Sequence, residues 1–173
     1  MKKILFMAAM VLLASNMVAE VIPAADSRVT FVGRTLVENG DVSFDWTGVY
    51  FRIAFTGKSL SMRASDIKWD TTTEMAATRH NYFNVWIDAP MSAEPHRIIE
   101  VASMDTIIEL IDPVYLKNSK VKVHQVIVQK RTEGEQGKTI IHEFATDAKG
   151  QFLQYMNITL FFGRAYRPSS LYT

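Results

Sequence analysis

Apolar and polar side chains alternate along much of the chain after residue 28. In residues 49–56 the sequence is V-Y-F-R-I-A-F-T, so Val49, Phe51, Ile53 and Phe55 share one face. A period of two residues is typical of a half-buried β-strand. Residues 60–65 repeat the alternation after a short turn that contains Gly57. We expect these two strands to form a β-hairpin.

Further strands are predicted at 29–32, 42–46, 81–88, 97–101, 106–111, 121–130, 139–145 and 151–153. In the segment 121–130 the alternation changes phase near His124 and Gln125, which predicts a β-bulge there. About ten short strands with closely spaced turns favour an all-β fold, an antiparallel sandwich or barrel. The best helical candidate is the segment 72–78, which is long enough for one or two turns.

The first 19 residues have the three-part pattern of a secretory signal peptide. Lys2 and Lys3 are followed by an apolar run from residue 4 to 14 and by small, mildly polar residues up to Ala19. We predict cleavage after Ala19, with Ala24 as the second choice; the alternative is a buried N-terminal strand or helix. The mature protein is then secreted or periplasmic, and no second apolar stretch is long enough to span a membrane.

Composition indicates one folded domain, at residues 26–154, because 48% of the residues are hydrophobic and 11% are aromatic. An aromatic and basic stretch, 155–173, follows as a divergent tail. The formal net charge of +1 argues against binding to nucleic acid, which needs a clear basic excess. The absence of cysteine excludes disulfides and thiolate metal sites and fits a bacterial export route.

Catalytic and metal-binding patterns are not recognisable in the sequence. The four histidines are His80, His96, His124 and His142. His124 and His142 are either ordinary sheet residues or face each other across a hairpin. Asp66, Asp70 and Glu74 are either part of a solvated loop or oxygen ligands for calcium, at a spacing that matches no known calcium loop. No G-x-S-x-G motif is present. We therefore assign no catalytic residue, metal or cofactor.

Aromatic side chains are the candidates for contact with sugar rings. Tyr82 and Trp86 share the strand face opposite Phe83 and Val85, and Trp69 precedes them in a loop. Aromatic residues with a polar tip are enriched at boundaries between apolar and wet surroundings. Trp69, Tyr82 and Trp86 thus either form a solvent-exposed platform for polysaccharide or pack under a loop.

Several segments in fixed order resemble the N-terminal β-sandwich, or jelly-roll, domain of carbohydrate esterase family 2, the secreted acetylxylan esterases. The segments are F-V-G-R (31–34), F-D-W-T-G (44–48), F-R-I-A-F-T-G-K-S-L-S-M (51–62), N-Y-F-N-V-W-I-D (81–88) and H-Q-V-I-V-Q-K-R-T-E-G-E-Q-G (124–137). The resemblance covers residues 28–153. It implies a jelly-roll-like antiparallel sandwich.

The resemblance also implies a missing partner. In the family, an SGNH-type hydrolase domain follows the sandwich and supplies the nucleophilic serine within a Gly-Asp-Ser motif, which this chain lacks. We therefore interpret the chain as an accessory domain of such an esterase, inactive by itself, whose partners are the hydrolase domain or a polysaccharide such as xylan. A stand-alone carbohydrate-binding module and a purely structural fragment are the alternatives. The tail is either a frame-shifted end or a divergent terminus.

Overall fold

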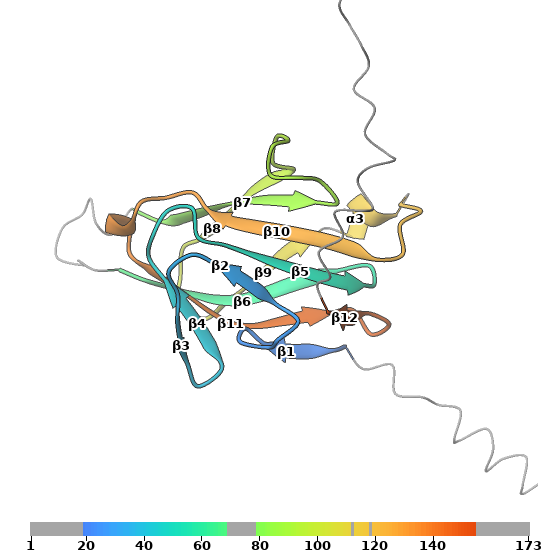
Figure 1. Cartoon of the computed structure of the whole chain (residues 1–173), viewed down its shortest axis with the longest axis horizontal. Helices are drawn as coiled ribbons and strands as arrows, with labels where there is room; N and C mark the ends of the chain where they lie inside the picture. Colours follow the sequence, from blue (N-terminus) through green and yellow to red (C-terminus); the bar gives the residue numbers. More distant parts are fainter. Residues whose placement is uncertain (1–18, 69–78, 112, 118, 155–173) are drawn as a thin grey trace, which may run out of the picture.

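The structure of the protein, a computed structural model, describes residues 19–68, 79–111, 113–117 and 119–154. These residues form two antiparallel six-stranded sheets that lie face to face (Figure 1). The first sheet has the order β3 (Leu36–Glu38), β4 (Asp41–Phe44), β11 (Lys138–Thr146), β6 (Leu60–Ile67) and β9 (Thr106–Ile111), with β1 (Val21–Pro23) beside β11. The second sheet has the order β12 (Gln151–Leu153), β5 (Tyr50–Thr56), β10 (His124–Lys130), β7 (Asn81–Ile87) and β8 (Arg97–Val101), with β2 (Thr30–Val32) beside β5.

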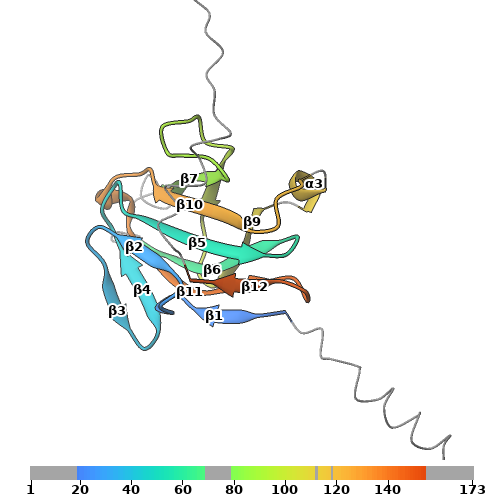
Figure 2. The same ribbon diagram turned by 45° about the vertical axis from the view of Figure 1, so that its right-hand side comes forward.

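The predicted all-β sandwich is confirmed. One helical turn, α3 (Pro113–Leu116), and one 3-10 turn, η1 (Gly134–Gln136), interrupt the loops of the described segments. In the turned view of Figure 2, β7, β10 and β5 follow one another as neighbouring strands of the second sheet. Alternate residues of each strand point into the space between the layers, as the period of two predicted.

The core lies between the sheets and is built from the apolar face of each strand. Phe51, Ile53 and Phe55 on β5 are fully buried, as are Leu60 and Met62 on β6. The rings of Phe51 and Phe144, one from each sheet, lie 5.1 Å apart in a tilted arrangement that aromatic pairs prefer. Burial of these large side chains joins the two sheets into one domain.

The predicted hairpin between residues 49–56 and 60–65 is wrong. Both strands exist, but β5 belongs to the second sheet and β6 to the first, so the turn between them crosses the sandwich. Gly57 makes the crossing possible with a φ of 128°, a conformation that side chains disfavour. The Asp147 carboxylate accepts a hydrogen bond of 3.1 Å from the Lys58 amide and ties this turn to the following β11–β12 crossing.

The predicted bulge at His124 is also wrong. β10 begins at His124 and keeps a continuous register against β5 through Gln129. Val121 and Val123 precede the strand and are half exposed, so the change of phase marks the start of the strand. A register shift occurs instead in β11, between Ile141 and Glu143, and leaves His142 as the extra residue.

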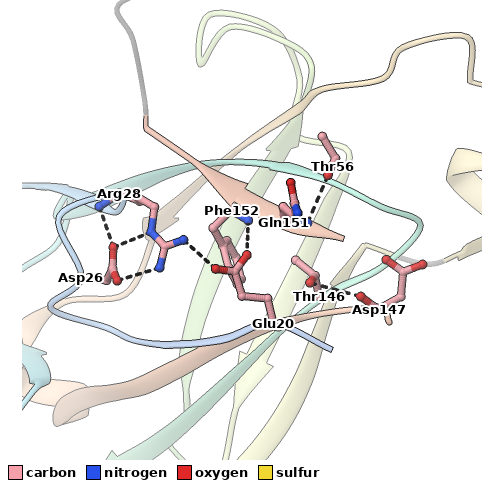
Figure 3. A network of polar contacts seen from close by, with 8 residues as sticks. All are labelled: Glu20, Asp26, Arg28, Thr56, Thr146, Asp147, Gln151 and Phe152. Atoms are coloured by element: carbon pink, nitrogen blue, oxygen red, sulfur yellow. Dashed lines mark hydrogen bonds and ion pairs between the residues drawn. The ribbon is translucent and has the colours of Figure 1, made fainter. Parts of the chain in front are cut away.

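Two strands were not predicted from the sequence: β1 and β3 have three residues each. A cluster of charged residues, which we call the Arg28 clamp, fixes β1 to the second sheet (Figure 3). The Arg28 guanidinium donates to Asp26 at 2.8 and 2.9 Å and to Glu20 at 2.6 Å, and Glu20 accepts a hydrogen bond of 2.7 Å from the Phe152 amide. The clamp therefore links the start of the fold to β12, its last described strand.

Several predictions fall on residues outside the described segments. These are most of the signal peptide, the 72–78 helical candidate and the tail 155–173. In the described segments, no helix has the length and apolar character to cross a membrane.

Candidate functional site

Tyr82 lies on the outer face of β7 and is the most exposed described member of the predicted sugar-contact set. Its side chain is 38% exposed, and its hydroxyl donates a 3.1 Å hydrogen bond to Glu100. β7 pairs with β8 so that Glu100 stands directly opposite Tyr82. The hydrogen bond to Glu100 raises the pKa of the Tyr82 phenol, so the hydroxyl stays protonated at neutral pH. Ring and carboxylate together form an amphipathic patch at one edge of the second sheet.

Trp86 shares the outer face with Tyr82 but is almost completely covered, with 4% exposure. Its indole Nε1 donates a 2.8 Å hydrogen bond to the carbonyl of Ala93, in the loop between β7 and β8. The structure thus places Trp86 under this loop, and Trp86 is not part of a solvent-exposed platform. Trp69, the third predicted member, lies outside the described segments.

A row of side chains crosses the outer face of the second sheet beside Tyr82. Strand registers align Ile98, Asn84, Gln129, Tyr50 and Val32 across β8, β7, β10, β5 and β2. The row combines amides with an aromatic ring, which are groups that hydrogen-bond and stack on sugars. The alternation in 49–56 already placed Tyr50 on the face opposite Phe51, but the strand order that builds the row was not predictable from alternation.

Three polar side chains from different strands meet on the outer face of the first sheet. The Ser65 hydroxyl oxygen lies 2.9 Å from His142 Nε2, and His142 Nδ1 lies 2.9 Å from Asp41 Oδ2. They come from β6, β11 and β4, which are neighbours in the order β4-β11-β6. Sequence reasoning missed this cluster because these residues match no catalytic spacing along the chain.

The two histidines considered as a facing pair belong to different sheets. His124 begins β10 and is buried at 3% exposure, with its Nδ1 2.7 Å from Asp88 Oδ2. His142 lies in β11, in the other sheet. A hairpin that brings them face to face is therefore wrong, and His124 is a core residue whose polar ring atom is paired.

Asp66, the one described member of the proposed acidic calcium cluster, is committed to protein partners. Its buried carboxylate accepts a 2.6 Å hydrogen bond from Asn81 and forms a 2.6 Å ion pair with Lys68. Asp70 and Glu74 lie outside the described segments. In the part of the chain that the structure describes, no group of three His, Asp or Glu side chains is arranged to hold a metal ion.

Lys130, the last residue of β10, is a buried cation at 1% exposure. Its ammonium group donates to the carbonyls of Thr132 at 3.0 Å and Glu133 at 3.2 Å. Burial lowers the pKa of this lysine to about 8, although nearby carboxylates oppose the shift. Lys130 holds the turn that leads through η1 to β11.

Comparisons with known proteins give a consistent result. The family model described as carbohydrate esterase 2 N-terminal matches residues 31–155. No curated protein matches the chain. Among solved structures, a family two carbohydrate esterase from Cellvibrio japonicus is 20% identical at a TM-score of 0.63, over 80% of this chain and 36% of that chain.

Two further solved structures share the fold. An acetyl xylan esterase from the rumen bacterium Butyrivibrio proteoclasticus is 12% identical at a TM-score of 0.60, over 80% of this chain and 34% of that one. A family two carbohydrate esterase from Clostridium thermocellum, in complex with cellohexaose, is 17% identical at a TM-score of 0.56, over 72% of this chain and 32% of that one. The chain thus spans about a third of the length of these esterases.

The family match extends from β2 to the end of the described segments and covers well over half of the chain. It agrees with the resemblance seen in the sequence and with the two-sheet fold shared with family two esterases. The chain belongs to the carbohydrate esterase 2 N-terminal family.

Proposed function

We propose that this chain is the accessory N-terminal domain of an exported, acetylxylan esterase-like carbohydrate esterase that acts on plant polysaccharide. Hydrolysis of the polymer's esters is then carried out by an SGNH-type hydrolase domain outside this sequence. The family match over residues 31–155 carries the proposal. The share of the solved esterases that the chain spans, about a third of each, supports a role as one part of such an enzyme.

The domain's role in this proposal is to bind or position polymer beside the hydrolase. Binding energy from sugar units away from the reacting ester can be used to orient that ester. The Clostridium thermocellum relative is seen with cellohexaose, a β-linked oligosaccharide, which supports a polymer of this kind as the ligand. Tyr82 and the row through Tyr50 and Gln129 are the described groups that suit such a contact.

Export is part of the same proposal. Cleavage after Ala19 retains Glu20 and β1, so the Arg28 clamp stays complete in the mature protein. Cleavage after Ala24 would remove Glu20 and the strand that pairs with β11. We therefore propose the first of the two cleavage sites and a secreted or periplasmic location.

A domain exchange tests the accessory role. This chain replaces the N-terminal domain of the Cellvibrio japonicus esterase, and the hybrid is compared with the same enzyme lacking its N-terminal domain. We expect the hybrid to hydrolyse acetylated xylan faster than the truncated enzyme, with equal rates on a small acetyl ester because the hydrolase site is unchanged. Equal rates of the two proteins on both substrates contradict the accessory role.

A stand-alone carbohydrate-binding module is the second candidate, favoured by the exposure of Tyr82 on the outer face of the second sheet. Calorimetric titration of the purified chain with xylohexaose and cellohexaose tests it. Saturable binding that Tyr82→Ala weakens supports this candidate. Absence of binding in both titrations, with activity in the hybrid esterase, leaves the accessory role alone.

A further inference from the structure

The cluster of Ser65, His142 and Asp41 has the connectivity of a nucleophile, a base and an orienting carboxylate. Ser65 Oγ and His142 Nε2 are 2.9 Å apart, and His142 Nδ1 and Asp41 Oδ2 are 2.9 Å apart. Both distances are within hydrogen-bond range. With the imidazole proton on Nδ1 and donated to Asp41, Nε2 accepts from the serine hydroxyl. This is the arrangement that activates serine in acyl transfer.

The backbone irregularity in β11 contributes to this arrangement. The register against β6 shifts between Ile141 and Glu143, so His142 has no partner residue on β6. Its carbonyl instead accepts a 2.9 Å hydrogen bond from the Ala24 amide beyond β1. β-Bulges re-aim side chains and are over-represented near active sites. Here the bulge brings the imidazole to the serine of the neighbouring strand.

Two carboxylates, Asp41 and Asp105, lie near the imidazole of His142. Asp41 contacts it directly, and Asp105 is close enough that His142 affects its titration. The pKa of the Asp105 carboxyl is lowered, first by the hydrogen bond from Arg63 and further by the proximity of His142. The Asp105 carboxylate is already paired with Arg63, so Asp41, in direct contact with Nδ1, is the carboxylate that orients the imidazole.

We propose that Ser65 is a nucleophile that accepts an acyl group from small esters, with His142 as general base and Asp41 as its positioning residue. Ser65 Oγ bonds to the ester carbonyl carbon while its proton passes to His142 Nε2. The carbon–oxygen bond to the alcohol breaks, and the alcohol takes that proton. Water, deprotonated by His142, then releases the acid and restores the serine. Atoms and charges balance without a cofactor.

Access to Ser65 requires a local movement. The residue is 4% exposed, and its hydroxyl oxygen also accepts a 2.9 Å hydrogen bond from the Asp105 amide. Arg63, two residues earlier on the same strand face, forms an ion pair with the Asp105 carboxylate. Both side chains are substantially exposed, so the pair opens readily. The Arg63 guanidinium lies on the same strand face as Ser65 and, once released, supplies a positive charge for the developing oxyanion.

This activity goes beyond the accessory role and does not depend on it. The sequence led us to expect an inactive chain because no catalytic spacing was recognised. The three side chains are separated by 77 and 101 positions and meet only through the strand order of the first sheet. In the accessory role the domain binds acetylated polymer, whereas the Ser65 site hydrolyses small, activated esters.

Covalent trapping tests the proposal on the purified full chain. An alkyl fluorophosphonate phosphonylates activated serines as fluoride leaves and the serine proton passes to the base. Peptide mass spectrometry then identifies the modified residue. We expect modification at Ser65 and none there in Ser65→Ala. Ser43→Ala is the matched control. Ser43 is 8% exposed and lies on the same outer face, and Ile140 of β11 separates it from Ser65. We expect this substitution to leave the labelling rate at Ser65 unchanged.

The base and its positioning residue have separate tests. His142→Ala slows the labelling of Ser65 by at least about 100-fold, and added imidazole restores part of the rate. Asp41→Asn slows labelling as well, while Asp41→Glu retains part of the wild-type rate. Urea unfolding of each variant shows whether it is folded. A slower labelling rate caused by unfolding is not restored by added imidazole.

Three results would overturn the proposal. One is no label at Ser65 under conditions that fully label the catalytic serine of a family two esterase. Another is an equal labelling rate in wild type and a folded His142→Ala variant. The third is wild-type hydrolysis of p-nitrophenyl acetate that Ser65→Ala does not reduce. Each leaves the cluster as a structural hydrogen-bond network. The domain exchange stays independent of these results when the exchanged chain carries Ser65→Ala, because turnover at Ser65 then adds nothing to the rate on the small ester.

Discussion

Replacement of Lys130 by methionine changes how the stability of the domain depends on pH. The wild-type ammonium group is buried at 1% exposure and satisfies two backbone carbonyls, those of Thr132 and Glu133. Burial lowers its pKa from 10.5 to about 8 in the folded protein. Methionine has a similar length and no charge, so it removes this titration while it fills most of the space.

The sign of the effect follows from proton binding. Between pH 8 and pH 10.5 the folded lysine loses its proton before the unfolded one does. The unfolded state then binds more protons, so the free energy of unfolding rises with pH in this window. From pH 7 to pH 10 the gain is about 2–3 kcal/mol, at about 1.36 kcal/mol per pKa unit. Lys130→Met lacks this gain.

Urea unfolding at pH 7, 8, 9 and 10 measures the effect for both proteins. Methionine also removes the Lys130 hydrogen bonds to the carbonyls of Thr132 and Glu133, which keep donors in the Thr47 hydroxyl and the Gln136 amide. This change in stability is independent of pH. The informative quantity is the free energy of unfolding of the wild type minus that of the variant, which we expect to rise by about 2–3 kcal/mol from pH 7 to pH 10. A difference that stays constant refutes a lowered pKa for Lys130.

Three more substitutions follow from the described contacts. Arg28→Met lowers the free energy of unfolding by about 1 kcal/mol at pH 7. The Arg28 hydrogen bond is the chief cause of the lowered pKa of Asp26, so the stabilisation by this ion pair is present above pH 4 and is lost as pH falls further. Urea unfolding at pH 7 and pH 3 that shows the same loss of stability at both values contradicts this. Trp86→Phe removes the hydrogen bond to the Ala93 carbonyl and costs about 1 kcal/mol, measured in urea; an unchanged midpoint argues against that bond. Gly137→Ala places a Cβ against the Ile67 carbonyl oxygen, closer than real Cβ atoms approach, at a φ of 117° and costs about 1–3 kcal/mol; a variant with wild-type thermal stability contradicts this conformation.

Strand positions were largely predictable because alternation is a local property. Residues 49–56 and 97–101 match β5 and β8 within one residue, since in each strand the residues that face the core, such as Phe51, Ile53 and Phe55 in β5, are two positions apart. Strand partners were not predictable in the same way. The link between β5 and β6 is short enough for a hairpin, so its length alone does not show that the chain crosses to the other sheet. The crossing is held by a contact that is distant in sequence, the hydrogen bond from the Lys58 amide to Asp147, 89 positions away.

The candidate sites show the same division between local and distant information. Tyr82 was placed on an outward strand face from alternation, and it is exposed. Trp86 shares that face, but its cover depends on the path of the following loop, which the sequence pattern does not encode. The contact between Ser65 and His142 depends on the neighbouring positions of β6 and β11 in the first sheet. Local periodicity carries no information about that order.

The accessory role is tested most directly by one ratio measured on the domain-exchanged Cellvibrio japonicus esterase. The ratio is kcat/KM on acetylated xylan divided by kcat/KM on a small acetyl ester, compared with the enzyme that lacks its N-terminal domain. If the domain positions polymer, the ratio is at least about tenfold higher in the hybrid, since about 1.4 kcal/mol of added binding is a factor of ten. An identical ratio in a folded hybrid contradicts the account.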